Sequence, residues 1–192
     1  ASGPSSAASA TPVMQQHAAA KAAHPDCIVF FRLGDFYEMF GDDAVLVAEQ
    51  LGLTLTSRNK GEPDEIPMAG VPHHAAHGYI ARLLAKGHKV AICEQLADPS
   101  TVRGIVPRDV VRVITPGTWT EAEQLGEREN SWLCSIVPAV AEEGGVGLAL
   151  LDLTTAELLV AELADASGLL AEVSRATPRE ILLSPAEPEA SS

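Results

Sequence analysis

The sequence predicts an α/β protein (α+β in layout) in which a mixed sheet is covered by helices. Short apolar runs rich in β-branched and aromatic residues alternate with stretches of helical periodicity, and glycine or proline stands at most boundaries. With 192 residues, of which 46% are apolar, the chain can bury a substantial core in one or two domains.

The first two elements are a helix and a strand. Thr11-Pro12 begins the helix, because proline is favoured at the first helical position, and His24-Pro25 ends it. The apolar run CIVFFRL then predicts a strand that ends at Gly34.

A second helix is expected directly after this strand. Asp35 has the form of an N-cap, and Glu38, three residues on, completes a capping box beside the partial positive charge of the helix N-terminus. Gly52 is the expected stop, and six apolar residues share one side at helical spacing: Tyr37, Phe40, Ala44, Val47, Ala48 and Leu51. On spacing alone, Glu38 caps the helix, Phe36 is a core or staple residue, and Tyr37 belongs to the core.

The remaining elements alternate in the same way. In the first part, strands are expected in LTLTSR, HKVAICEQL and VVRVITPG, a mobile loop at residues 59–66, and a helix roughly from Pro72 to Lys86. In the second part, WLCSIVPAV and VGLALLDL form a hairpin around EEGG, and AELLVAEL is a third strand. A short helix in SGLLAEVSRA and a strand in TPREILLS follow.

Charge divides the chain into two parts. Residues 1–118 hold 10 Lys and Arg against 12 Asp and Glu, a net charge of −2. Residues 119–192 hold 3 against 14, a net charge of −11, which completes the total of −13. We therefore expect a tail at 1–10, a first domain at 11–118, a linker at 119–129 and an incomplete second domain at 130–192.

Several functional classes find no support in the sequence. The three cysteines, Cys27, Cys93 and Cys134, have no zinc or dithiol spacing and suit a reducing cytoplasm. No apolar run is long enough for a membrane span, and residues 1–10 lack the pattern of a signal peptide. No phosphate-binding G-x-x-x-x-G-K-[ST] motif occurs.

Five motifs together resemble one known family. TPVMQQ, FFRLGDFYEMFGDDA, IPMAGVPHHA, GHKVAICEQLADP and VVRVITPGT, in this order and spacing, resemble the N-terminal mismatch-recognition domain of the bacterial MutS family of DNA mismatch-repair proteins. The resemblance covers residues 11–118. Residues 130–192 resemble the start of the family's connector domain, which implies a partial ribonuclease-H-like fold.

The resemblance implies a function in DNA mismatch repair. It implies binding to double-stranded DNA with mismatches or small loops, in the bacterial cytoplasm at the nucleoid, and a MutL-type repair partner contacted through 130–192. The family's ATPase, with its ATP and Mg, and its clamp belong to regions that this chain lacks. We therefore expect a monomer without cofactor or enzyme activity that binds DNA weakly and, in isolation, discriminates mismatches poorly.

The resemblance also assigns the principal site. It implies that Phe36 enters the minor groove as a wedge and stacks on a mispaired base, and that Glu38 hydrogen-bonds that base. Three further residues are candidate DNA contacts: Arg58, Lys60 and Met68. Solvated loop charges remain the alternative for the two cations, and core packing remains the alternative for Met68. Arg103, Arg108 and Arg112 are additional cations that the sequence does not rank.

Two other features raise rival functions. His73, His74 and His77 share a helix face at metal-binding spacing, but no carboxylate or cysteine stands beside them, so no metal site is expected. Asp152 stands where a ribonuclease-H-like nuclease would place a metal-binding carboxylate, near Glu157, and a solvent-exposed strand end is the favoured alternative. An acidic protein-docking surface in residues 119–192 is the third hypothesis, with ordinary solubilising surface as its alternative.

Overall fold

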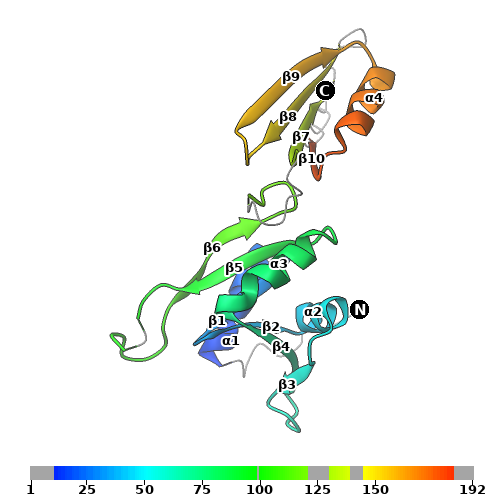
Figure 1. Ribbon diagram of the computed structural model, residues 1–192. Helices are drawn as coiled ribbons and strands as arrows, with labels where there is room; N and C mark the ends of the chain where they lie inside the picture. Colours follow the sequence, from blue (N-terminus) through cyan, green and yellow to red (C-terminus); the bar gives the residue numbers. More distant parts are fainter. Residues whose placement is uncertain (1–10, 99, 121–129, 139–144, 184–192) are drawn as a thin grey trace, which may run out of the picture. The chain divides into compact units, whose positions relative to one another are not determined.

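The computed structural model describes residues 11–98, 100–120, 130–138 and 145–183 and forms two compact units, Ala1–Ile114 and Thr115–Ser192 (Figure 1). Both units combine a sheet with helices, which confirms the α/β class. The predicted tail at 1–10 and most of the predicted linker lie outside the described residues. Within the described part, no helix is both long and apolar enough to cross a membrane.

Unit 1 is built on a six-stranded mixed sheet in the order β3-β4-β2-β1-β5-β6, in which only β1 and β5 pair in parallel. Its strands are β1 (Cys27–Leu33), β2 (Phe36–Phe40), β3 (Thr56–Arg58), β4 (Ile66–Pro72), β5 (Lys89–Gln95) and β6 (Arg108–Ile114). Its helices are α1 (Pro12–Ala23), α2 (Asp42–Leu51), the 3-10 turn η1 (His73–Ala75) and α3 (Ala76–Leu84). The first helix and the strands in CIVFFRL, LTLTSR, HKVAICEQL and VVRVITPG are therefore confirmed.

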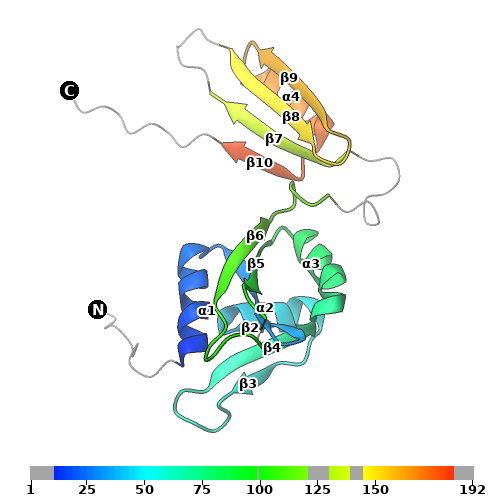
Figure 2. The ribbon, with the colours of Figure 1, turned by 90° about the vertical axis from the view of Figure 1, so that its left-hand side faces the viewer.

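Helices cover the two faces of this sheet unequally. Helix α1 packs on β1 and β6 on one face, whereas α2 and α3 pack on β2, β4 and β5 on the other, as Figure 2 shows for α1 and α3. The core between α1 and the sheet includes Cys27, Val29, Phe31 and Phe40. On this face α1 reaches β2 and β4 only around Phe40 and Met68, so among the described residues no helix packs on the end of β2 that holds Phe36.

The helix predicted to start at Asp35 is wrong in its first turns. Leu33 pairs with Phe36, so Gly34 and Asp35 form a two-residue hairpin loop, and Gly34 has the positive φ of 58° that such loops demand. Residues 36–40 alternate between the faces of a strand. Helix α2 begins only at Asp42, after Gly41, with no side-chain cap. The capping box is therefore absent, whereas the stop at Gly52 is confirmed by its left-handed backbone, φ 69°.

A strand precedes the helix predicted at Pro72. Residues Ile66–Pro72 form β4, which pairs with β2 along its whole length and with β3 at its start. Proline and glycine within IPMAGVP weaken the strand pattern, because both residues are unfavourable inside strands. The helix predicted roughly from Pro72 to Lys86 is confirmed, as η1 followed by α3, whereas β4 was not predicted.

Unit 2 is a four-stranded sheet in the order β10-β7-β8-β9, with α4 (Ala166–Ala176) packed on β8 and β9. Its strands are β7 (Trp132–Val137), β8 (Val146–Asp152), β9 (Glu157–Leu163) and β10 (Glu180–Leu183). The first three form an antiparallel meander and β10 joins β7 in parallel. All five predicted elements of this unit are confirmed, whereas the connection at 139–144 lies outside the described residues.

Candidate nucleic-acid interface

Phe36 and Glu38 lie side by side on the uncovered face of the unit 1 sheet. Directly paired residues of antiparallel strands point to the same face, and residues two apart on one strand do so as well. Phe36 pairs with Pro72, and Glu38 pairs with Gly70. Phe36 is 47% exposed, which contradicts its interpretation as a core or staple residue. An aromatic ring and a carboxylate are thus presented together to solvent.

Helix α1 covers this face of β2 only at its Phe40 end. The His17 ring of α1 packs edge-on against Phe31 and Phe40, at centroid distances of 5.5 and 5.0 Å. On this face of β2, Phe40 is buried, Glu38 is half-buried and Phe36 is exposed, so the face opens toward Phe36. The same strand therefore has one end anchored in the core and the other end free to meet a ligand.

The opposite face of β2 is firmly held. Tyr37 is buried, as predicted, and its hydroxyl donates a hydrogen bond to the Glu94 carboxylate. The guanidinium of Arg32 lies over the Tyr37 ring at 5.6 Å, and the His73 ring packs on it at 5.4 Å. Burial, first, and the bond to Glu94 raise the pKa of Tyr37, so it stays a neutral donor. This anchoring fixes the strand and hence the directions of its exposed neighbours.

The carboxyl group of Glu38 is half-buried, and its surroundings disfavour charge. Partial burial raises the pKa of Glu38 above its ordinary value, while the positive charge of Arg58 acts in the opposite direction. No helix N-terminus acts on Glu38, because α2 starts four residues later. The group is consequently closer to switching between acceptor and donor than an ordinary surface glutamate.

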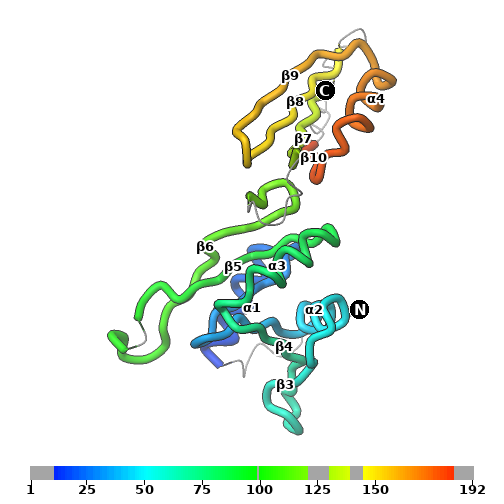
Figure 3. The backbone as a smooth tube through the Cα atoms, viewed as in Figure 1, coloured from blue at the N-terminus to red at the C-terminus, as the bar shows by residue number. Residues whose placement is uncertain are grey.

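The other predicted contacts are distributed around this pair. Arg58 ends β3 and is half-buried, and Lys60 is exposed in the connection between β3 and β4, which projects from the sheet in Figure 3. Met68 lies opposite Phe40, half-buried against the α1 core, so it reaches both the core and the open face. The structure thus gathers Phe36, Glu38 and Met68 on one face, with Arg58 at its edge.

Gly70 is a residue of this face that sequence reasoning missed. It stands directly opposite Glu38, and it is exposed. A glycine inside a strand is the signal that could have identified it, because it often marks a close approach of another molecule. The missing strand prediction for β4 concealed that signal.

The cations left unranked by the sequence have different roles. Arg108 donates from Nε to the Arg32 carbonyl at 2.7 Å and from Nη1 to the Val106 carbonyl at 2.9 Å, and it lies over the Phe31 ring. It is therefore part of the framework. Arg103 and Arg112 are exposed, in the connection between β5 and β6 and on β6 itself.

Asp152 is not at an exposed strand end, so that expectation is wrong. The residue is 1% exposed, and its carboxylate accepts from the backbone N–H of Ser131 at 3.1 Å and from the N–H and hydroxyl of Thr154 at 2.8 and 2.6 Å. Burial alone would raise the pKa of Asp152, but these hydrogen bonds outweigh it and the pKa is lowered. The carboxylate therefore joins the last residue of β8 to Ser131, the residue before β7.

The three histidines predicted to share a helix face do not gather into a metal site. His73 and His74 are exposed and His77 is half-buried. In the described ranges, no group of three or more His, Cys, Asp or Glu side chains could hold a metal ion. Glu157 pairs with Asp152 across the β8–β9 hairpin, and its carboxylate accepts from the Asn130 amide.

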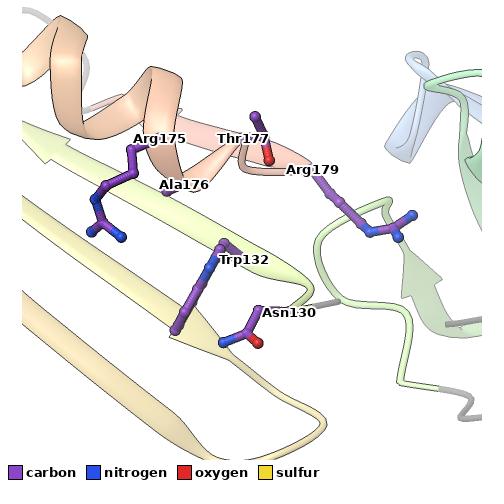
Figure 4. Close-up of a pocket in the computed structure, with 6 residues that line it drawn as sticks. All are labelled: Asn130, Trp132, Arg175, Ala176, Thr177 and Arg179. Carbon is purple, nitrogen blue, oxygen red and sulfur yellow. The ribbon is translucent and has the colours of Figure 1, made fainter. Parts of the chain in front are cut away.

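Unit 2 has a shallow pocket of about 560 Å³ at the end of α4 (Figure 4). Arg175 and Arg179 extend to opposite sides of Trp132, and they are the two basic residues that the structure describes in this unit. Arg175 is paired with Glu172, with Nη2 2.7 Å from Oε2. The pocket therefore carries less free positive charge than its residue types suggest.

Fold and site together define a class. The chain is a two-unit α/β protein whose first unit presents an aromatic ring and a half-buried carboxylate on an open sheet face, and whose second unit is acidic. Comparison with known families gives the assignment. The model of MutS domain I matches residues 11–123 and that of MutS domain II matches residues 131–192, so the chain belongs to the MutS family.

Curated relatives support the same assignment. A protein named DNA mismatch repair protein MutS from Sorangium cellulosum is 64% identical over 180 residues, which is 90% of this chain and 20% of the relative. Proteins of the same name from Desulfatibacillum aliphaticivorans and Symbiobacterium thermophilum are 48% and 50% identical over 178 and 182 residues. Each of these two matches covers 93% of the chain and 20% of the relative. The chain spans about a fifth of the length of the curated relatives it matches.

Proposed function

We propose that this chain is the mismatch-recognition part of a MutS-type repair protein, with Phe36 as a wedge and Glu38 as a probe of base pairing. One observation carries the proposal: a 47% exposed phenylalanine and a half-buried carboxylate stand two residues apart on the open end of one face of β2, whose other face is buried. Membership of the MutS family supplies the class of ligand, DNA with mispaired or unpaired bases.

The wedge exploits the weakness of a mispair. Inserting an apolar side chain between base steps unstacks the duplex at a cost of a few kcal/mol per step, and the cost is lowest where pairing is already poor. Stacking a base on an aromatic ring returns about 1–3 kcal/mol and tolerates any base. Phe36 would therefore detect weak pairing without reading sequence.

Glu38 would test hydrogen bonding. Phosphates repel a charged carboxylate, so this side chain would be a poor general DNA contact. It becomes useful when it accepts from an imino N–H exposed by mispairing, or when it is protonated and donates. Its raised pKa lowers the cost of the protonated form in the groove. The same two side chains would thus test stacking and pairing separately.

The charge of the chain limits its affinity. Unit 1 has no excess of cations to neutralise phosphates, since it holds 10 Lys and Arg against 12 Asp and Glu. The four candidate phosphate contacts, Arg58, Lys60, Arg103 and Arg112, are exposed or half-buried. We expect a monomer that binds DNA weakly and depends on other regions of the family's longer proteins for a full clamp and for ATP hydrolysis with Mg. No cofactor is proposed for this chain, and its proposed location is the bacterial cytoplasm at the nucleoid.

The proposal is tested by fluorescence anisotropy at low salt with a G·T-mismatched duplex and its matched counterpart. Phe36→Ala should weaken mismatch binding by about 5- to 150-fold, the equivalent of the stacking term of about 1–3 kcal/mol. Circular dichroism should show an unchanged fold. Glu38→Ala should reduce the preference for the mismatch more than the binding of the matched duplex.

Val111→Ala is the matched control for Phe36→Ala, since Val111 is an exposed apolar residue, 55% exposed, on the far edge strand β6. It should leave binding unchanged. A Phe36→Ala chain that keeps its full mismatch preference would refute the wedge. If Phe36→Ala unfolds instead, Phe36 acts as a core residue and its assignment as a wedge fails.

A second function, docking of a MutL-type protein partner, is favoured by one observation on unit 2. The edge strand β9 exposes Leu158 and Val160, at 60% and 75%, on a unit with a large negative charge. Exposed apolar side chains rimmed by charge are typical of interaction surfaces. Capture of the chain by a purified MutL-type protein, lost on Val160→Asp, would support this function, and unchanged capture would contradict it.

A further inference from the structure

Gly70 occupies a central position on the open face of unit 1. It lies in β4 directly opposite Glu38, and its neighbours on the same face of β4 are Met68 and Pro72, both half-buried. The β4 side of the open face thus has two side chains with a gap between them, and the gap adjoins Glu38.

Nothing in the fold demands glycine at this position. Gly70 is absent from the glycines with positive φ, whereas Gly34 in the nearby hairpin loop has φ 58°. A Cβ built on Gly70 would meet its nearest atoms at 3.5 Å or more, which is ordinary van der Waals contact. Glycine inside a strand also loses more conformational entropy on folding than alanine does. The absence of a side chain here therefore carries a cost that neither backbone nor packing explains.

The side-chain atoms nearest to this position indicate the function of the gap. The added Cβ would lie 3.7 Å from Cγ of Glu38 and 3.9 Å from Cδ1 of Phe36. These are the two side chains of the proposed wedge and probe. Any side chain at position 70 would rest against them and cover the flank from which a base edge must reach the Glu38 carboxyl.

We propose that Gly70 is a specificity-determining residue whose missing side chain lets the floor of a distorted minor groove settle against Glu38. This inference rests on the proposed function of Phe36 and Glu38. A deformed duplex must approach the strand closely for a short carboxylate to reach a base, and glycine permits such an approach. Contacts to phosphates at the edge of the face do not need this clearance.

The effect should grow with the size of the side chain. Gly70→Ala adds one methyl group in ordinary contact, so the fold should be kept and the mismatch preference reduced. Gly70→Val fills the gap and should abolish the preference, while binding of the matched duplex changes less than twofold. Valine is favourable in strands, which protects the fold of this variant.

Gly147→Ala is the matched control. Gly147 is also a strand glycine without positive φ, and its added Cβ would lie 3.5 Å from Cβ of Val137, again an ordinary contact. It belongs to β8 of unit 2, outside the proposed interface. Its substitution should leave the ratio of mismatched to matched affinity unchanged.

The experiment measures that ratio by anisotropy at low salt, with a duplex carrying a G·T pair or one unpaired base, for the native chain, the three glycine variants and Phe36→Ala. Loss of preference in Gly70→Val and a partial loss in Gly70→Ala, with native circular dichroism, is the expected result. If both Gly70 variants keep a preference that Phe36→Ala loses, the role of Gly70 is refuted and the proposed function stands. If the native chain shows no preference, or Phe36→Ala keeps it, both fail together. Should Gly70→Val unfold, Gly70→Ala alone decides.

Discussion

Replacing Asp152 by asparagine should destabilise unit 2 through hydrogen bonding alone. The carboxylate accepts from Ser131 N–H with one oxygen and from Thr154 N–H and Oγ1 with the other. Asparagine is isosteric and keeps one oxygen acceptor, so it can satisfy Thr154. Its NH₂ group would then face the Ser131 N–H, leaving two donors opposed in a site that is 1% exposed.

The magnitude follows from the lost bond. Hydrogen bonds to charged groups contribute about 1.5–3 kcal/mol, and a buried donor left without a partner costs about 1–3 kcal/mol. These two figures describe the same loss, so Asp152→Asn should cost about 2–3 kcal/mol. With a urea dependence of roughly 1 kcal/mol per molar for so small a unit, the unfolding midpoint should fall by about 2–3 M.

Tryptophan fluorescence isolates unit 2 in this assay. The chain has two tryptophans, Trp119 and Trp132; both are buried and both belong to unit 2, whereas unit 1 has none, so their emission reports mainly on unit 2. Circular dichroism follows both units together. Urea titrations of the native and variant chains at neutral pH give the two midpoints directly.

Glu157→Gln is the control for Asp152→Asn. Glu157 is the exposed partner of Asp152 in the β8–β9 register, and its substitution should change stability by less than about 0.5 kcal/mol. An unchanged or higher midpoint in Asp152→Asn would refute the structural role. A carboxylate retained for metal chemistry commonly stands in a strained site that is relieved by substitution, so that result would favour the nuclease hypothesis instead.

Lowering the pH tests the contribution of the Asp152 carboxylate to stability in a second way. The folded pKa of Asp152 is lowered, so its contribution to stability is present above its ordinary value of 3.8. That contribution is lost as pH falls through the lower folded value. The midpoint difference between the native chain and Asp152→Asn should therefore be largest near neutral pH and shrink below about pH 4.

Three other predictions concern unit 1. Burial is the main cause that lowers the pKa of His17, so the unfolded chain binds a proton at a higher pH than the folded chain does. Unit 1 should therefore lose stability as pH falls below the ordinary histidine value of 6.5. His17→Phe should flatten this pH dependence in urea titrations followed by circular dichroism. Gly34→Ala should cost about 1–2 kcal/mol, because alanine resists φ of 58° in the hairpin loop. Glu38 should titrate in NMR above its ordinary value of 4.5, and Arg58→Met should raise its pKa further by removing the opposing positive charge.

Each of these predictions has a contradicting result. An unchanged pH dependence in His17→Phe would show that another group controls the acid response. A Gly34→Ala chain as stable as the native one would argue against the β1–β2 hairpin and would revive a helix at Asp35. A pKa of Glu38 that does not rise in Arg58→Met would separate Arg58 from the candidate interface. Lys60→Met, which changes an exposed cation outside the strands, is the control for Arg58→Met.

Local sequence was sufficient to predict an element wherever its residues fitted only one secondary-structure pattern. Proline at the first helical position and Gly52 after the last turn define the limits of α1 and α2, since both act through the backbone of their own residues. Unit 2 was predicted element by element, because its strands are clear apolar runs separated by turn residues. The resemblance of five motifs to the MutS family was likewise present in the sequence, and the family comparison confirms it.

Local sequence failed where two patterns coincided. Residues 35–40 satisfy a capping box and an apolar helical stripe, yet they also alternate as a strand, and local propensity does not separate these readings. Pairing with β4 decides between them, and β4 lies about thirty residues further on in a segment whose proline and glycine hide its strand character. Only when β1, β2 and β4 come together does Tyr37 turn inward and Phe36 outward.

The burial of Asp152 and the clearance at Gly70 depend on tertiary structure in the same way. An acidic residue at a strand end is normally solvated, and only the arrival of Ser131 beside Thr154 creates donors that hold it inside. Gly70 gains meaning only as the partner of Glu38 in an antiparallel register. The sequence by itself determined the family, the sites of chain reversal and most of the elements, because these depend on residues close together in the chain. Which side chains face solvent, and which carboxylates are buried, depended on contacts between distant segments, and those contacts exist only in the folded protein.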